Sequence, residues 1–286
     1  MPVSLLFCEG GAASPDVRLL GLILRGAGVE VAPAGGKDGF RSLVRSWRGH
    51  AEVEARGPRV CGIIDGDFPR HPGAWSAPLE DAPLQWKVRE NAAEVVLGWR
   101  WCRKEIENYF VDPAVLQRAF KWDDQARQSY TDHLEIVFSG LEVVTAARMA
   151  LTASAPQRVR VETELPLDLS PDQAEEALAQ RAKDHSEGAS LDAAGLVRVF
   201  QDVLPDCRRG GKFRQHALST FAGKNILSRI QNTAGFDRAL KRRDALFETI
   251  LEALARDVSP HSWLPEWSGL RSCVESWEPT GCGLRV

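Results

Sequence analysis

Short apolar runs alternate with amphipathic segments along the first hundred residues. Four runs are rich in apolar residues and short enough to be strands. They cover residues 3–8, 29–32, 60–64 and 97–102. Between them, residues 16–26 repeat apolar side chains at a helical period, and a second helix is expected over residues 38–49. Because apolar strands that alternate with helices are typical of a buried parallel sheet, the pattern predicts an α/β fold.

Helical periods replace the strands after residue 112. One helix is expected to start at Asp112-Pro113, because proline is common at the first helical position. A capping box at Ser170 predicts a second helix over residues 170–185, and further helices are expected over residues 191–203 and 236–255. A near-heptad stripe from Tyr130 to Leu151 predicts one long helix packed in the core, with a homodimer or partner seam as the alternative. We therefore expect two domains, an α/β one at residues 1–112 and a mainly helical one at residues 113–286.

Composition narrows the setting of the protein. The 286-residue chain has a formal net charge of −3, so any contact with nucleic acid must come from local basic patches. The six cysteines include no C-x-x-C pair, which indicates reduced thiols. The best candidate for a zinc site is weak and consists of Cys273, Cys282 and the distant His261. We find no signal-peptide pattern and no apolar run near the ~20 residues that span a bilayer, so a cytoplasmic protein without a membrane segment is expected.

Acidic residues follow two of the predicted strands. Glu9 ends the first strand, and Asp65 and Asp67 follow the third in an Asp-Gly-Asp step. The carboxyl ends of parallel strands meet in one crevice, so these three side chains should converge. Crowded carboxylates raise each other's pKa, and a hard cation such as Mg²⁺ or Mn²⁺ relieves the repulsion. The pattern predicts a metal site suited to phosphoryl chemistry.

Other chemistry fits the same residues less well. A lone Asp-x-Asp is often only a turn or a helix cap, and a glycosyltransferase would leave Glu9-Gly10 unexplained. A phosphatase of the haloacid dehalogenase type would place its Asp-x-Asp on the first strand. Residues 35–38, Gly-Gly-Lys-Asp, lack the spacing of a Walker A motif, so we expect no ATP site in this chain.

Three motifs together resemble a known family. They are Glu9-Gly10, the Asp65-Gly66-Asp67-Phe68 step, and residues 103–110, which contain Glu-Asn-Tyr. In this order they look like the Toprim domain, and most like the branch around the OLD (overcoming lysogenization defect) nucleases and small Toprim proteins of phage-defence loci. The resemblance covers about residues 3–112, and it implies that the predicted domain at residues 1–112 is a Toprim-like catalytic domain. A Gly-Lys step at Gly36-Lys37 and another at Gly223-Lys224 also resemble that branch.

The resemblance assigns roles to particular residues. It implies that Glu9, Asp65 and Asp67 bind Mg²⁺ or Mn²⁺, with Glu9 also able to act as a general acid or base. Glu107 matches the carboxylate of the Glu-Asn-Tyr element and would complete the site.

Three further residues carry weaker assignments. Glu105 rivals Glu107, because both lie on one side if the chain is extended there. Asp16 matches a second acidic metal position, although its interval from Glu9 is longer than in OLD enzymes. Lys224 would neutralise the attacking or leaving oxygen.

The expected function is metal-dependent cleavage of DNA or RNA. The resemblance implies a bacterial anti-phage effector controlled by a separate ABC-type ATPase, since this chain has no ATPase motif. The alternative is a non-catalytic Toprim module that binds nucleic acid or such a partner. A topoisomerase or primase is disfavoured, because the chain is short and shows no strand-transfer tyrosine domain. Basic clusters at residues 208–214 and 238–243 are candidate contacts for nucleic acid.

Overall fold

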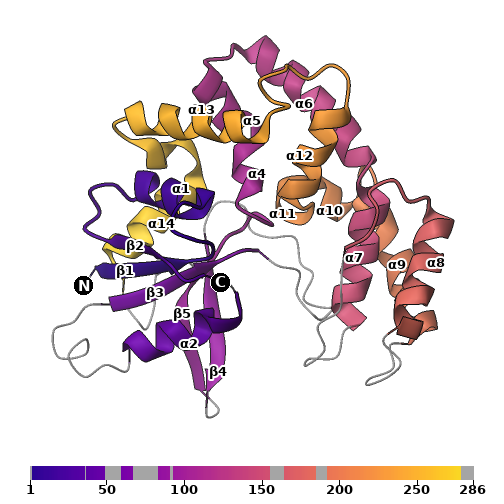
Figure 1. Ribbon diagram of the computed structural model, residues 1–286, viewed down its shortest axis with the longest axis horizontal. Coiled ribbons are helices and arrows are strands. Elements are labelled where there is room, and N and C mark those ends of the chain that lie inside the picture. Colours follow the sequence, from indigo (N-terminus) through magenta and orange to yellow (C-terminus); the bar gives the residue numbers. More distant parts are fainter. Residues whose placement is uncertain are drawn as a thin grey trace.

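The α/β expectation is confirmed by a computed structural model, which describes residues 2–35, 37–48, 59–66, 83–90, 93–154, 164–184 and 192–277. The described chain forms a five-stranded sheet in the order β2-β1-β3-β5-β4, with helices on both faces (Figure 1). The strands are β1 (Val3–Cys8), β2 (Glu30–Pro33), β3 (Arg59–Ile64), β4 (Leu84–Glu90) and β5 (Ala93–Arg100).

The sheet is mostly parallel, but one edge differs from the prediction. β2, β1, β3 and β5 run parallel, as the alternation of apolar runs and helices predicts. β4 pairs antiparallel with β5, and the pattern of apolar runs did not predict this strand. Its residues alternate between apolar and polar side chains, as befits an edge strand with one solvated face. β5 begins at Ala93, four residues before the predicted start at Leu97.

Helices from both ends of the chain lie around the sheet. They are α1 (Pro15–Ile23) and α2 (Lys37–Arg48) near the N-terminus, and α13 (Arg243–Arg256), the 3-10 helix η2 (Pro260–Trp263) and α14 (Pro265–Glu275) near the C-terminus. Among them, α13 packs on α1 and on α5 (Pro113–Phe120). In Figure 1, α1 and α14 lie on one face and α2 on the other. The Trp277 ring packs on Trp99 of β5 with centroids 5.0 Å apart. The C-terminal segment therefore packs against the sheet. The domain boundary predicted at residue 112 stays a prediction.

The middle of the chain is helical. Its helices are α4 (Glu107–Phe110), α5 (Pro113–Phe120), α6 (Asp124–Ser139), α7 (Glu142–Ser154), α8 (Pro171–Asp184), α9 (Ala193–Cys207), α10 (Lys212–Gln215), α11 (Ala217–Thr220) and α12 (Gly223–Asn232). The predicted capping box is present: the Gln173 N–H donates to Ser170 Oγ at 3.3 Å, and the Ser170 N–H donates to Gln173 Oε1 at 2.8 Å. Asp112 caps α5, again as predicted.

Two helix predictions were wrong. The stripe from Tyr130 to Leu151 does not form one helix, because α6 ends at Ser139 and α7 continues at an angle of 56°. Leu141 at the break is fully buried, so the chain bends there to keep apolar side chains on the core. α13 begins at Arg243, seven residues later than predicted.

The cysteines and the helix lengths bear on two expectations from composition, namely reduced thiols and the lack of a membrane segment. Five cysteines are buried and form no disulfide within the described residues, as expected for reduced thiols, while Cys282 of the weak zinc set lies outside those residues. Across the described ranges, no single helix has the length and apolar character to cross a membrane, although the bent pair α6 and α7 passes that test when taken together.

Candidate functional site

Glu9 and Asp65 meet at the carboxyl edge of the sheet. Each follows the end of its strand, and β1 and β3 are parallel neighbours with Cys8 opposite Ile63. The backbone N–H of Asp65 donates to Glu9 Oε1 at 3.3 Å, and both residues are half-buried. The structure therefore brings these two predicted site residues together. Asp67, the third acid of the prediction, lies outside the described residues.

Gly10 makes the turn that places Glu9. Its φ of +93° lies in the left-handed region, and a Cβ there would come 2.5 Å from Ser14 Oγ. Gly10 also exchanges backbone hydrogen bonds with Gly35 at 3.0 and 3.1 Å. Ser14 then caps α1, whose first turn carries Asp16. Of the nearby Gly-Lys step, Gly36 and the side chain of Lys37 are outside the described part.

Gly66 lets the segment after β5 approach the strand ends. A Cβ on Gly66 would lie 2.2 Å from the Arg103 carbonyl oxygen and 2.8 Å from that of Trp101. Only a glycine fits such a close backbone approach. The Asp65-Gly66 turn thereby packs on the chain that leads into the Glu-Asn-Tyr element.

That element is helical, which corrects the expectation of an extended chain at Glu105 and Glu107. Glu107 is buried at the start of α4. Asn108, fully buried, accepts from the Glu105 N–H at 2.9 Å and donates through Nδ2 to the Phe221 carbonyl at 2.9 Å. Asn108 therefore ties α4 to the segment that precedes Gly223-Lys224, a role that sequence reasoning did not assign.

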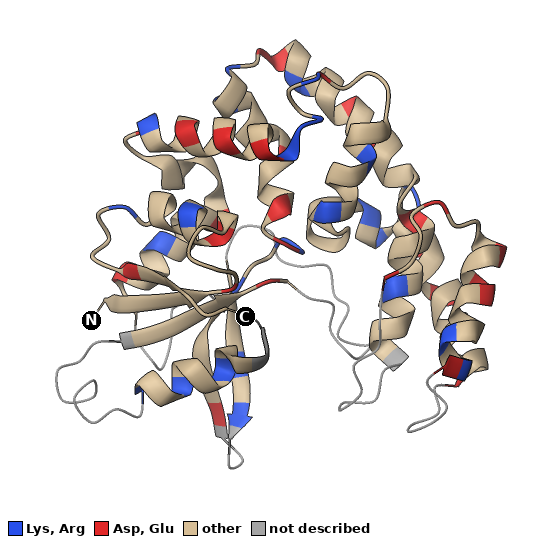
Figure 2. Ribbon diagram, in the orientation of Figure 1, with Lys and Arg blue, Asp and Glu red and all other residues tan. Residues whose placement is uncertain are grey.

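Two cations face Glu107. Its Oε1 lies 3.9 Å from Lys224 Nζ and 2.9 Å from an Arg243 guanidinium nitrogen. The Lys224 side chain is 60% exposed, so most of its charge faces solvent. Glu105 accepts the backbone N–H of Lys224 at 3.2 Å. Figure 2 shows basic residues on α12 and at the start of α13, beside the acidic residue of α4.

The acids at this edge influence each other's protonation. The pKa of Asp16 is raised to about 6, chiefly by burial and also by the charges of Glu107 and Glu9, while a backbone hydrogen bond and Lys224 act in the opposite direction. Burial also raises the pKa of Glu107, against the pull of Lys224 and Arg243. The carboxylates of β1, α1 and α4 thus share one electrostatic environment with Lys224, which is the setting in which a cation binds favourably.

The donor chemistry suits a hard cation. Glu9 and Asp65 offer oxygen atoms only, and Mg²⁺ commonly binds one or two carboxylates and keeps water for the rest. Burial raises the pKa of the nearby Cys8 thiol to about 12, so a thiolate ligand for zinc is disfavoured. Within the described ranges, no group of three His, Cys, Asp or Glu side chains is placed to hold an ion. The fit therefore rests on Glu9 and Asp65.

The first basic cluster serves the fold in part. Arg214 is buried and forms ion pairs with Glu135 at 2.9 Å and Glu142 at 3.1 Å. Lys212 pairs with Asp206 at 3.0 Å. The candidate contact with nucleic acid at residues 208–214 therefore reduces to the exposed Arg208 and Arg209.

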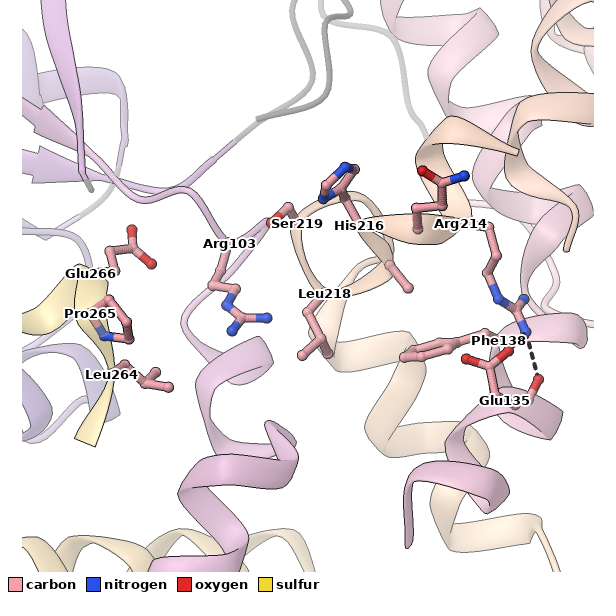
Figure 3. A pocket seen from close by; sticks show the side chains of 12 residues that line it. Arg103, Glu135, Phe138, Arg214, His216, Leu218, Ser219, Leu264, Pro265 and Glu266 are labelled. Atoms are coloured by element: carbon pink, nitrogen blue, oxygen red, sulfur yellow. Dashed lines mark hydrogen bonds and ion pairs between the residues drawn. The ribbon is translucent and has the colours of Figure 1, made fainter. Parts of the chain in front are cut away.

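A pocket of about 330 Å³ lies between α14 and the α10–α11 region, and Arg103 points into it from between Leu218 and Pro265 (Figure 3). Its wall includes the buried Glu266, which accepts from the Cys102 N–H at 2.6 Å and from the Tyr109 hydroxyl at 2.5 Å. Glu266 thus anchors the segment that carries Glu105 and Glu107, a contact that no motif indicated.

Comparison of the chain with protein-family models, with curated proteins and with solved structures gives no match. The residues above are therefore interpreted from their own geometry and chemistry.

Proposed function

We propose that this protein is a Toprim-like, metal-dependent nuclease that hydrolyses phosphodiester bonds of DNA or RNA. The observation that carries the proposal is the hydrogen bond from the Asp65 N–H to the Glu9 carboxylate, which joins the acidic ends of two parallel strands. This is the edge of an open α/β sheet where ligands generally bind.

Different residues of the chain would bind the metal and neutralise the phosphate. Glu9 and Asp65 would hold Mg²⁺ or Mn²⁺, with Asp67 as the next acid in sequence and Asp16 and Glu107 as the neighbouring carboxylates. Such an ion polarises a phosphoryl oxygen and lowers the pKa of bound water. Lys224 would neutralise a phosphate oxygen of the substrate, and the carboxylate of Glu107 would keep the Lys224 and Arg243 side chains in place.

The resemblance to small Toprim effectors supports a setting in bacterial anti-phage defence. In that setting a separate ABC-type ATPase would restrain or release the nuclease. The competing proposal is a non-catalytic module, which would bind nucleic acid or the ATPase without needing Glu9 or Asp65.

A cleavage assay separates these two functions. Purified protein is incubated with Mg²⁺ or Mn²⁺ and labelled single-stranded DNA, duplex DNA or RNA, alone and with the ATPase if a neighbouring gene encodes one. Wild type should cut, and Glu9→Gln and Asp65→Asn should lower the rate by about 10²-fold or more. The matched control is Glu94→Gln, an exposed carboxylate at the opposite end of the same sheet. Cutting that survives both site variants would exclude this site.

A further inference from the structure

A second, shallow pocket of about 480 Å³ opens between α7 and α12. Its lining consists of Arg148, residues 164–167, Asn225 and Ser228. The wall opposite α7 is tied to α12, because Arg229 donates to the Leu167 carbonyl at 2.6 Å and pairs with Asp168 at 2.5 Å. These contacts fix residues 167–168 beside α12.

Three polar side chains in this pocket have no partner in the described part of the chain. They belong to Arg148, Asn225 and Ser228, which are all half-buried. The Nε of Arg148 is buried without an acceptor. An arginine keeps its charge even where burial lowers its pKa, as it does here. A buried donor without an acceptor is unfavourable, and an anion in the pocket would supply acceptors for all three groups.

The pocket adjoins the candidate active site. Lys224 and Ser228 lie one turn apart on α12, so they share a face of that helix. Lys224 reaches Glu107, and its backbone N–H is held by Glu105. The charges of Glu105 and of Glu164, a residue that lines the pocket, also act on Arg148. Helix α12 therefore carries both Lys224, which faces Glu107, and Ser228, which lines the pocket.

We propose that Arg148, Asn225 and Ser228 bind a backbone phosphate of the polynucleotide strand that the Glu9–Asp65 site would cleave. Arginine, asparagine and serine are common donors to backbone phosphates, and arginine can bind one in bidentate fashion. The described lining residues include no aromatic ring on which a base could stack. The pocket should therefore bind the strand by its backbone, without reading its sequence. This inference rests on the proposed nuclease function, whose substrate it positions.

The test measures binding apart from cleavage. Full-length protein carrying Asp65→Asn is titrated, in EDTA, against labelled mixed-sequence single-stranded DNA and RNA, and fluorescence anisotropy is read over a series of salt concentrations. Adding Arg148→Gln should weaken binding about tenfold. It should also reduce the slope of log K against log salt by about 0.7. The control Arg198→Gln removes an equal charge from an exposed position on α9 and should change neither value.

A second variant keeps the inference testable if the Arg148→Gln protein does not fold. Asn225→Ala with Ser228→Ala removes two donors without a change in charge, so it should weaken binding several-fold and leave the salt slope unchanged. Inorganic phosphate and a mononucleotide are added as competitors, and neither should displace the strand at an equal phosphate concentration. Equal affinity of the Arg148 and Arg198 variants, absence of strand binding, or displacement by the mononucleotide would each overturn the inference.

The two proposals fail in different ways. If cleavage depends on Asp65 but binding does not depend on Arg148, the phosphate-pocket proposal is wrong and the nuclease proposal stands. If binding depends on Arg148 but no cleavage depends on Asp65, the phosphate-pocket proposal stands and the nuclease proposal is wrong.

Discussion

Gly223 packs directly against Glu107, so closely that a Cβ built on Gly223 would lie 2.7 Å from the Glu107 Cβ and 2.6 Å from the Asn108 nitrogen. The absence of a side chain allows α12 to begin beside α4. This approach places Lys224, the next residue, within 3.9 Å of the Glu107 carboxylate.

A methyl group at Gly223 should disturb this contact. Gly223→Ala should lower the free energy of unfolding by about 1–3 kcal/mol, because α12 must move away from α4. Cleavage should fall as well, since Lys224 moves with the helix. The control is Gly21→Ala in α1, where an added Cβ meets nothing within 4 Å. Urea unfolding and initial rates check both effects, and equal stability of the two variants would disprove the packing argument.

Asp16 should make stability depend on pH in metal-free solution. Its pKa rises from the ordinary value of 3.8 to about 6 on folding, chiefly through burial, so the folded state binds the proton more tightly. The resulting stability is present in full below about pH 4 and is lost as pH rises through about 6. Asp16→Asn should remove about 2 kcal/mol of this decline, as measured by urea unfolding between pH 4 and pH 7. The exposed Asp202→Asn should keep the wild-type profile; a similar flattening in both variants would contradict the assignment.

Divalent cations should stabilise the folded protein. At a concentration of Mg²⁺ or Mn²⁺ a hundred times its dissociation constant, a single site adds about 2.7 kcal/mol. Thermal unfolding in cation and in EDTA should therefore differ for wild type and for Glu94→Gln. Glu9→Gln and Asp65→Asn should lose the difference. A shift that persists in those two variants would place the ion elsewhere.

The anchor at Glu266 should matter for stability. Glu266→Ala leaves the Cys102 N–H and the buried Tyr109 hydroxyl without their acceptor, which should cost about 2–4 kcal/mol. Glu266→Gln keeps one carbonyl oxygen and the side-chain shape, so its loss should be smaller. Glu252→Ala, at an exposed position of α13, is the control. If alanine and glutamine proved equally harmless in chemical denaturation, Glu266 would not anchor this segment.

The sequence alone predicts the strand ends well. Val3–Cys8 and Arg59–Ile64 are short apolar runs that stop at an acid, so both the strands and the meeting of Glu9 with Asp65 follow from local pattern and the geometry of parallel sheets. Asp112 and Ser170 could also be predicted as helix caps, because capping is a local interaction.

Long-range contacts could not be predicted in this way. Arg243 meets Glu107 across 136 positions, and no periodicity of either segment indicates the pair. The same holds for Glu266, whose partners lie in the segment after β5. The break at Leu141 was missed because the apolar stripe continues across it, and only packing against the core decides where the helix bends. β4 was missed because an edge strand needs less apolar character than a central one.

The central claim is that Glu9 and Asp65 share one divalent cation. Its most direct test is anomalous diffraction from crystals of the full chain grown with Mn²⁺. We predict an anomalous peak bonded to carboxylate oxygens of both Glu9 and Asp65, and its disappearance in Asp65→Asn crystals. A well-ordered edge of the sheet without such a peak, or a peak bound only by other residues, would contradict the account.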